Sequence, residues 1–419
     1  MKIFNFLRYA ILLLPLWWFL GLTSVIFHVI VLFIFFILLV KKKIVVPKQT
    51  IFLFLFICVY ILSVIINYEE IPFDRLLATL YNLSYWIVGF LLIIVIYNSS
   101  IDFRQILKLS KSFVILGTGC GLLSLLGIIL FFNGYHRLTI TTPVGDFLLP
   151  FFKKAPIITN SFCFFLLFKD YTGFGVLPRG TLFFGWPTAL GMAMGITIPI
   201  TVFYYKVKNR IFNALPHLFF QIIGLFFSLS RVVVIGLFIS YFLVYYLRTK
   251  KVRRIIILNF IIFGFLLIFL LQIHSKLMLK VEEFRKGSSK TRIKLYSWII
   301  KTTLSEKPFF GFGFKPKEEN IDIPLASHST YLSNLFKSGV IGLSLLVLFW
   351  FSIYKKWYSQ MKLIIEKKFL LLHNFIGLIF FQGLIWQLTE DIDATLIVPF
   401  LYFIIVGLII SFEKIKVVI

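Results

Sequence analysis

The apolar runs of this sequence constrain its fold more than any other feature. A helix needs about 20 consecutive apolar residues to cross the hydrocarbon core of a bilayer. Runs near that length recur along the whole chain, at about residues 9–22, 24–40, 49–67, 76–97, 112–132, 179–204, 211–229, 231–247, 255–273, 329–353, 369–388 and 395–412. The first two are short and are expected to form one hairpin through Gly21–Ser24. Since 60% of the 419 residues are hydrophobic, the chain is predicted to be an all-α integral membrane protein of about 12 transmembrane helices, with a single polytopic domain over residues 1–419.

The charged residues sort by side of the membrane once the N-terminus is placed in the cytoplasm. Short inside segments then hold the basic clusters at 41–43, 206–210, 248–254, 355–368 and 414–416, and outer segments hold the acids at 69–74, 282–283, 318–322 and 390–393. This asymmetry follows the positive-inside rule and predicts that both termini are cytoplasmic. The net charge of +26 is therefore interpreted as a topology signal, and nucleic acid is not expected as a partner.

Two predicted outer segments are longer than tight turns. The first covers residues 133–178, and its apolar patch at 162–168 is expected to dip into the membrane interface. The second covers residues 274–328 and is rich in Lys and Arg, which the topology does not require on this side. A basic outer loop would act as an electrostatic funnel for an anionic partner. The three cysteines are scattered and predict neither a disulfide framework nor a zinc site: Cys58, Cys120 and Cys163.

His328 is the strongest local candidate for chemistry. It lies where the outer loop is expected to re-enter the membrane as a helix, with Ser327 as the N-cap. The partial positive charge of a helix start disfavours an imidazolium ion, so the ring would stay neutral and could act as a general base. The unpaired N–H groups of the same helix start could hold a phosphate. The alternative is a histidine that only packs at a helix cap. The following residues are supporting candidates: Ser329, Thr330 and Tyr331.

Three arginines near the outer membrane boundary form the second candidate group. Arg179 is expected to open one span, Arg231 lies in a tight outer turn, and Arg292 begins an amphipathic outer stretch at 291–304. At helical spacing Tyr296 shares a face with Arg292. Guanidinium groups stay charged in a low-dielectric site and bind phosphate in a bidentate way. For any single arginine, snorkelling to the interface is the alternative interpretation.

Two outer turns complete the candidates. Pro308 is expected to end the amphipathic helix, and Gly311 and Gly313 to allow a tight bend before the next span. The acids at Thr389–Asp393 could bind a divalent metal or act as a base. A solvated turn on the acidic side is the preferred interpretation of these acids.

In this order, the motifs resemble those of the O-antigen ligase and O-antigen polymerase superfamily. The resemblance covers roughly residues 175–350, and the N-terminal third of the chain agrees with the family only in topology. Four stretches carry it: Arg179-Gly180-Thr181 to Trp186-Pro187 and Leu190-Gly191; Ser230-Arg231; Arg292 to Trp298 with Pro308 to Gly313; and His328-Ser329-Thr330-Tyr331-Leu332 with Gly339 and Gly342. Trp186 and Ser329 stand where the family usually has Asn.

The resemblance implies a membrane glycosyltransferase of the GT-C type that needs neither a metal nor another cofactor. Its substrate would be a saccharide on undecaprenyl pyrophosphate, and its active site would face outward from the bacterial cytoplasmic membrane. Arg179, Arg231 and Arg292 would hold the pyrophosphate, and His328 would activate an acceptor hydroxyl for inverting transfer. The preferred function is polymerisation of surface-polysaccharide repeat units, with a chain-length regulator as a further partner; the alternative is a ligase that moves the finished glycan to a lipid A core or another acceptor.

Two functions of other classes compete with this hypothesis. A transporter or flippase for lipid-linked saccharide would predict two related halves, and the sequence contains no half-to-half similarity. A structural scaffold of an envelope assembly complex would tolerate His328→Ala and Arg292→Ala, whereas an enzyme would not.

Overall fold

The chain is mostly helical in the computed structural model, which describes residues 3–41, 44–152, 161–172, 175–248, 288–316, 328–362 and 364–415. Seven helical stretches in this part are long and apolar enough to cross a membrane: 48–66 (η1, Lys48–Thr50, with α4, Ile51–Ile66), α5 (Phe73–Tyr97), α6 (Phe103–Phe132), α9 (Pro187–Val207), α11 (Arg231–Arg248), α14 (Thr330–Gln360) and α15 (Lys367–Trp386). Each coincides with one of the predicted runs, so these seven predictions are confirmed by length and composition.

The remaining predicted spans are shorter helices or lie outside the described residues. Shorter apolar helices are α1 (Ile3–Leu12), α3 (Ile26–Lys41), η3 with α10 (Ile211–Ala214 and Leu215–Phe227) and α16 (Val398–Ser411). The expected hairpin near Gly21 is present: α2 (Leu14–Phe19) ends before it, and Gly21 has a φ of 69°. The run at 255–273 lies outside the described residues, so the total of about 12 spans is not confirmed.

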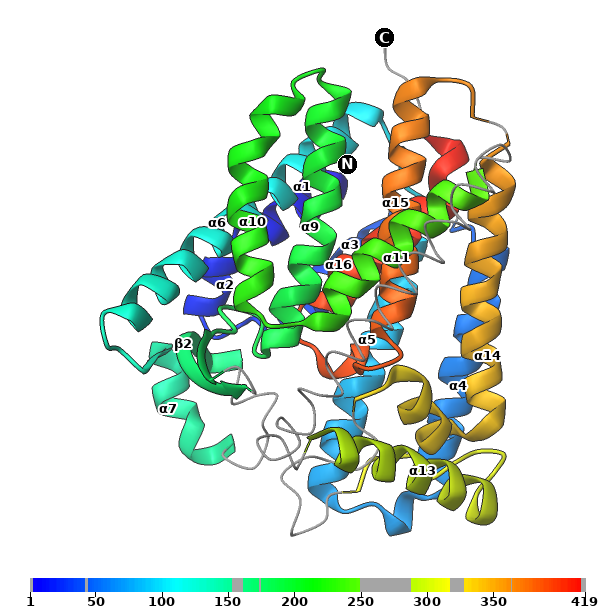
Figure 1. Cartoon of the computed structure of the whole chain (residues 1–419). Coiled ribbons are helices and arrows are strands. Elements are labelled where there is room, and N and C mark those ends of the chain that lie inside the picture. Colours follow the sequence, from blue (N-terminus) through cyan, green and yellow to red (C-terminus); the bar gives the residue numbers. More distant parts are fainter. Residues whose placement is uncertain are drawn as a thin grey trace.

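The short helix α16 occupies the centre of the bundle (Figure 1). All of its residues are buried, and it packs against α5, α9, α14 and α15. The contact with α5 is close because Gly89 has no side chain: a Cβ there would come within 2.5 Å of the Phe403 ring. A helix of 14 residues is about 21 Å long. Because longer helices surround it, α16 has no need to span the hydrocarbon core by itself.

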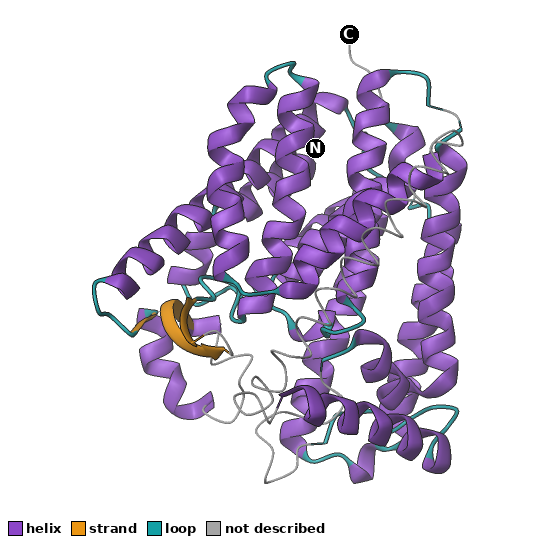
Figure 2. Ribbon diagram, in the orientation of Figure 1, coloured by secondary structure: helices purple, strands orange, loops and turns teal. Residues whose placement is uncertain are grey.

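The first outer segment contains a β-sheet, so the prediction of an all-α chain is wrong there. Strands β1 (Arg137–Thr141), β2 (Cys163–Thr172) and β3 (Gly175–Arg179) form an antiparallel sheet in the order β1-β2-β3 (Figure 2). The strands are rich in aromatic and branched side chains, which favour pleated structure, and their ladder satisfies backbone groups that a loop would leave open. Helix α7 (Pro143–Phe152) connects β1 to the segment before β2.

Most of the apolar patch at 162–168 is buried against protein. Its residue Phe164 lies 5.3 Å from the Trp18 ring of α2 and 4.8 Å from the Phe183 ring, between ring centroids. Its residue Leu167 is fully buried. The patch therefore forms part of the outer core and attaches the sheet to the bundle.

Helix α14 is broken at Gly339, and a loop inserts at the break. Gly339 has a φ of 65° and a ψ of −168°. The carbonyls of Phe336 and Lys337 accept from the N–H groups of Phe312 and Gly313, at 2.8 and 2.9 Å. The N–H of Val340, just beyond the break, donates to the Pro308 carbonyl at 2.8 Å. The predicted bend at 308–313 is thus present, and it satisfies the backbone groups that the break exposes.

Helix α13 (Ser288–Glu306) lies across one end of the bundle, near α14 and α4 (Figure 1). Its inner face packs on the first turns of α14, where Ile299 and Phe336 are buried together. The Trp298 and Phe312 rings stack on Phe336, at centroid distances of 5.6 and 4.5 Å. The predicted helix that ends before Pro308 is therefore present.

Candidate functional site

His328 adopts a left-handed backbone conformation immediately before α14. Its φ is 74°, a value that is uncommon for a residue other than glycine and that accumulates at functional sites. The following residue, Ser329, is the N-cap, and its hydroxyl accepts from the Leu332 N–H. The prediction of Ser327 as the cap was therefore wrong by two residues, and Ser327 itself lies outside the described residues. His328 is half-buried, at the boundary between loop and bundle.

Tyr296 of α13 holds the backbone of His328. Its hydroxyl donates to the His328 carbonyl at 2.8 Å. This bond joins the outer helix α13 to the start of α14. Since Arg292 lies one helical turn before Tyr296, the bond brings the backbone of Arg292 to the same region as His328. The side chain of Arg292 lies outside what the structure describes.

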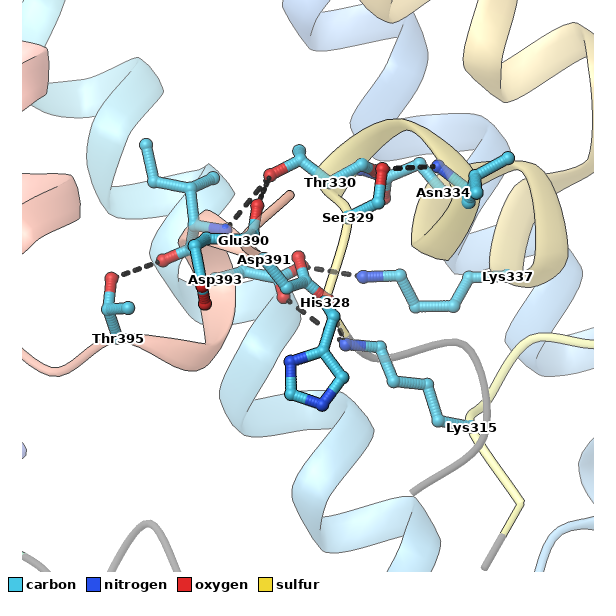
Figure 3. Close-up of polar contacts among 12 residues, drawn as sticks. Lys315, His328, Ser329, Thr330, Asn334, Lys337, Glu390, Asp391, Asp393 and Thr395 are labelled. Carbon is cyan, nitrogen blue, oxygen red and sulfur yellow. Dashed lines mark hydrogen bonds and ion pairs between the residues drawn. The ribbon is translucent and has the colours of Figure 1, made fainter. Parts of the chain in front are cut away.

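Thr330, the first residue of α14, is hydrogen-bonded to the turn between α15 and α16. Its N–H donates to the carbonyls of Gln387 and Glu390, at 2.9 and 3.1 Å. Its hydroxyl donates to the Glu390 carbonyl at 2.9 Å and accepts from the Ile392 N–H at 3.0 Å (Figure 3). The N–H groups of Thr330 and Leu332 therefore have acceptors inside the protein, which argues against the helix start as a phosphate site.

The other two supporting candidates contact the end of α15. The Ser329 hydroxyl lies 3.4 Å from the Gln387 carbonyl, and the Tyr331 hydroxyl lies 3.5 Å from the Leu384 carbonyl. Both bonds are long. These contacts orient the start of α14 against α15.

Thr330→Val is expected to lower the thermal midpoint of the purified protein. Valine keeps the shape but removes the hydroxyl, which leaves the buried Ile392 N–H without its acceptor, at a cost of about 1–3 kcal/mol. The measurement is a thermal melt in detergent. Ser305→Ala is the control, because Ser305 is exposed and its hydroxyl makes only a 3.3 Å bond to Thr302. A Thr330→Val melt that matches that of Ser305→Ala would show that the hydroxyl contributes nothing.

Arg179 and the turn before Arg231 contact each other. The Arg179 Nε donates to the Ser228 carbonyl at 3.1 Å. Leu229 has a φ of 51°, and the Ser228 hydroxyl accepts from the Ser230 N–H at 3.2 Å. Arg231 follows as the first, exposed residue of α11. The structure thus brings these two sequence-predicted arginines to one turn, although 52 residues separate them along the chain.

Arg179 ends β3, so the prediction that it opens a membrane span is wrong. Helix α9 begins eight residues later, at Pro187. The intervening backbone cannot continue a helix because Leu182 and Gly185 have φ values of 49° and 72°. Packing explains the glycine of the Leu190-Gly191 stretch. A Cβ at Gly191 would lie 2.6 Å from the Ser230 Cβ, so only glycine lets α9 approach the turn at 228–230.

Glu390 links this arginine region to His328. The Thr188 hydroxyl, in the first turn of α9, lies 3.4 Å from a Glu390 carboxylate oxygen. The Glu390 carbonyl accepts both donors of Thr330. The starts of α9, α11 and α14 therefore lie close together, and α13 contacts them through Tyr296.

Asp391 and Asp393 belong to a buried ionic cluster and not, as preferred from the sequence, to a solvated turn. They are 4% and 1% exposed. Lys315 pairs with Asp391 and lies 3.7 Å from Asp393. Lys337 pairs with Asp393 at 2.6 Å (Figure 3). Both carboxylates therefore face ammonium groups, and in the described part of the chain no three His, Cys, Asp or Glu side chains gather as metal ligands.

The cluster changes the acidity of the two carboxyls in opposite directions. Burial, and then the charge of Asp393, raises the pKa of Asp391. Burial also acts to raise the pKa of Asp393, but Lys337 and Lys315 outweigh it and hold that pKa below its ordinary range. Sequence reasoning missed this cluster. The available signal was Lys337, a charge within an apolar run, since such charges are usually functional or paired.

The family model of the O-antigen ligases matches residues 217–347. This stretch includes the turn at 228–230, α13, His328 and the break in α14, and with them Arg231 and Arg292. Arg179 and the turn with Asp391 and Asp393 lie outside it. No curated protein matches the chain.

Proposed function

From the match of residues 217–347 to the O-antigen ligase family, we propose that the chain transfers oligosaccharide from undecaprenyl pyrophosphate. The family consists of membrane glycosyltransferases that act on lipid-linked glycans. The transfer would take place on the outer face of the bacterial cytoplasmic membrane. The charge asymmetry of the loops supports this sidedness. The basic outer segment at 274–328 suits the anionic pyrophosphate of the donor.

The proposal rests on one observation above all, the hydrogen bond between Tyr296 and the His328 carbonyl. It joins the helix that carries Arg292 to the residue that is the best candidate for a base. The bond between Arg179 and Ser228 gathers the other two arginines at the same end of the bundle. A cationic region beside a histidine is what transfer from a pyrophosphate requires.

In the proposed reaction the acceptor hydroxyl gives its proton to the His328 imidazole. The hydroxyl oxygen attacks the anomeric carbon of the donor sugar from the face opposite the pyrophosphate. The bond between that carbon and the pyrophosphate oxygen breaks, and its electron pair leaves with undecaprenyl pyrophosphate. Arg179, Arg231 and Arg292 would stabilise the negative charge that develops on the leaving group. The product has inverted configuration, and transfer is expected to persist in EDTA because no step uses a metal.

Polymerisation of repeat units is the preferred form of this reaction. The acceptor would then be another lipid-linked saccharide. The alternative is a ligase that moves the finished glycan to a lipid A core or another acceptor. The matching family is described as O-antigen ligases, which supports this alternative. Both forms use the same donor and the same chemistry, so the acceptor alone separates them.

Cells that carry His328→Ala are expected to lose long surface polysaccharide. The measurement is the length distribution of the polysaccharide, with the membrane level of the protein checked by immunoblot. Single repeat units without long chains would support a polymerase, and lipid-linked long chains that accumulate without transfer would support a ligase. His136→Ala is the matched control, because His136 is exposed in the first outer segment. A normal length distribution at a normal protein level would contradict the role of His328.

A further inference from the structure

The turn between α15 and α16 holds both ends of one short helical segment. We call residues Thr330–Ser338 the first segment of α14, because the break at Gly339 separates them from the rest of the helix. At the start of this segment, Thr330 bonds to Gln387, Glu390 and Ile392. Near its end, Lys337 bonds to Asp393. The turn at 387–393 therefore spans the whole first segment.

The spacing of the two attachments explains how one turn can reach both. Lys337 follows Thr330 by seven residues, which is about two helical turns and returns to the same face. Two attachments on one face define both the rotation of a helix about its axis and its position along that axis. His328 lies two residues before Thr330 and follows any such movement.

The C-terminal end of the segment is also held through its backbone, which leaves the helix at Gly339. The Lys337 carbonyl accepts from the Ser63 hydroxyl and the Gly313 N–H, at 2.7 and 2.9 Å. These bonds restrain the backbone against α4 and the inserted loop. The Lys337 side chain connects the end of this segment to the turn that also bonds to Thr330.

The ion pair between Lys337 and Asp393 is fully enclosed by protein. Both side chains are 1% exposed, and their charged atoms are 2.6 Å apart. Asp393 also accepts from the Trp86 indole at 2.9 Å, and the Lys337 ammonium lies 5.0 Å from the centroid of the Tyr60 ring. Together with Lys315 and Asp391, the cluster has two positive and two negative charges. A pair in this environment is strong and directional because water cannot screen it.

We propose that the Lys337–Asp393 ion pair positions the catalytic histidine: it ties the first segment of α14 to the turn at 387–393 and so places His328 over the reacting atoms. This role rests on the proposed function, in which His328 is the base. Because both side chains are enclosed by protein, they act through Thr330 and the backbone that follows His328. The ion pair has a positioning role, and the proton transfer is carried out by His328.

Three variants separate positioning from charge balance. Asp393→Asn keeps the shape but leaves the cluster with one excess positive charge, and Lys337→Met leaves one excess negative charge. Either single change strands a buried charge and is expected to lower the protein level. The double variant Lys337→Met/Asp393→Asn restores neutrality but lacks the ionic link. If the pair positions His328, the double variant recovers the protein level but not the turnover.

The kinetic test uses purified full-length protein with a lipid-linked donor. In the double variant kcat is expected to fall about 100-fold, the loss typical of a misplacement near 1 Å, while the KM for the donor stays near the wild-type value because the arginines are untouched. Glu413→Gln is the control: it breaks the Lys356–Glu413 pair, 2.7 Å long with Glu413 half-exposed, far from His328 in the chain. Wild-type kcat in the double variant would contradict a catalytic effect of the pair, and the modification rate at His328 then shows whether the positioning role or the base is wrong.

A second measurement does not depend on catalysis. Diethyl pyrocarbonate modifies accessible histidines, and mass spectrometry reports the rate at each site. In the double variant the rate at His328 is expected to change relative to the rate at exposed His136, which serves as an internal reference. A changed rate with no loss of kcat would mean that the pair positions His328 but that His328 is not the base, so the proposed function would fail alone. An unchanged rate would overturn the positioning role itself.

Discussion

Purified protein carrying His328→Ala is expected to transfer saccharide with a kcat about 100- to 10,000-fold below that of wild type, the usual range for loss of a general base. The KM for the lipid-linked donor is expected to change little, because the arginines that would bind the pyrophosphate remain. Release of undecaprenyl pyrophosphate from the donor, with the protein in lipid nanodiscs, measures both constants.

Two companion variants define what the loss means. His136→Ala changes an exposed outer histidine and is expected to leave kcat unchanged. Tyr296→Phe removes the hydroxyl that donates to the His328 carbonyl but keeps the imidazole, so its loss of kcat is expected to be smaller than that of His328→Ala. If His328→Ala kept a kcat close to that of His136→Ala, another group would have to take the proton.

Gly339→Ala is expected to remove most of the folded protein from the membrane. A Cβ at this position would lie 2.2 Å from the Phe309 carbonyl oxygen and 2.3 Å from its carbon. These are backbone atoms of the inserted loop, which cannot rotate away as a side chain can. The φ of 65° adds strain for any residue other than glycine. We expect a destabilisation above about 4 kcal/mol, which is exceptional for one methyl group.

The matched control is Gly119→Ala in α6, where a Cβ would meet nothing within 4 Å. Alanine in an open helical position is expected to be neutral or to stabilise by up to about 1 kcal/mol. Detergent-solubilised protein, analysed by size exclusion and thermal melting, reports both variants. A Gly339→Ala protein that eluted and melted like Gly119→Ala would mean that the break in α14 can relax without cost.

Much of the fold and part of the candidate site were predictable because their signals are local. An apolar run long enough to span a bilayer leaves few alternatives to a helix, and seven of the predicted runs are helices of sufficient length. The amphipathic pattern and Pro308 predicted α13 and its end. The spacing of Arg292 and Tyr296 placed both on one helix face, and Tyr296 does contact His328. The helices and the shared face depend on neighbours in the sequence, so the sequence alone determined them, whereas the contact with His328 is tertiary.

The tertiary structure decided what depends on partners far along the chain. The acids at Thr389–Asp393 look like a solvated turn until Lys337, 56 residues before Asp393, brings its charge within 2.6 Å. Residues 162–168 look like an interfacial segment until β1 and β3 pair with β2 and Trp18 covers it. The sequence determined which helices are long and apolar enough to cross a membrane. The tertiary packing decided which charged side chains are buried. A buried charge needs a partner of opposite charge, and here that partner lies far away in the sequence.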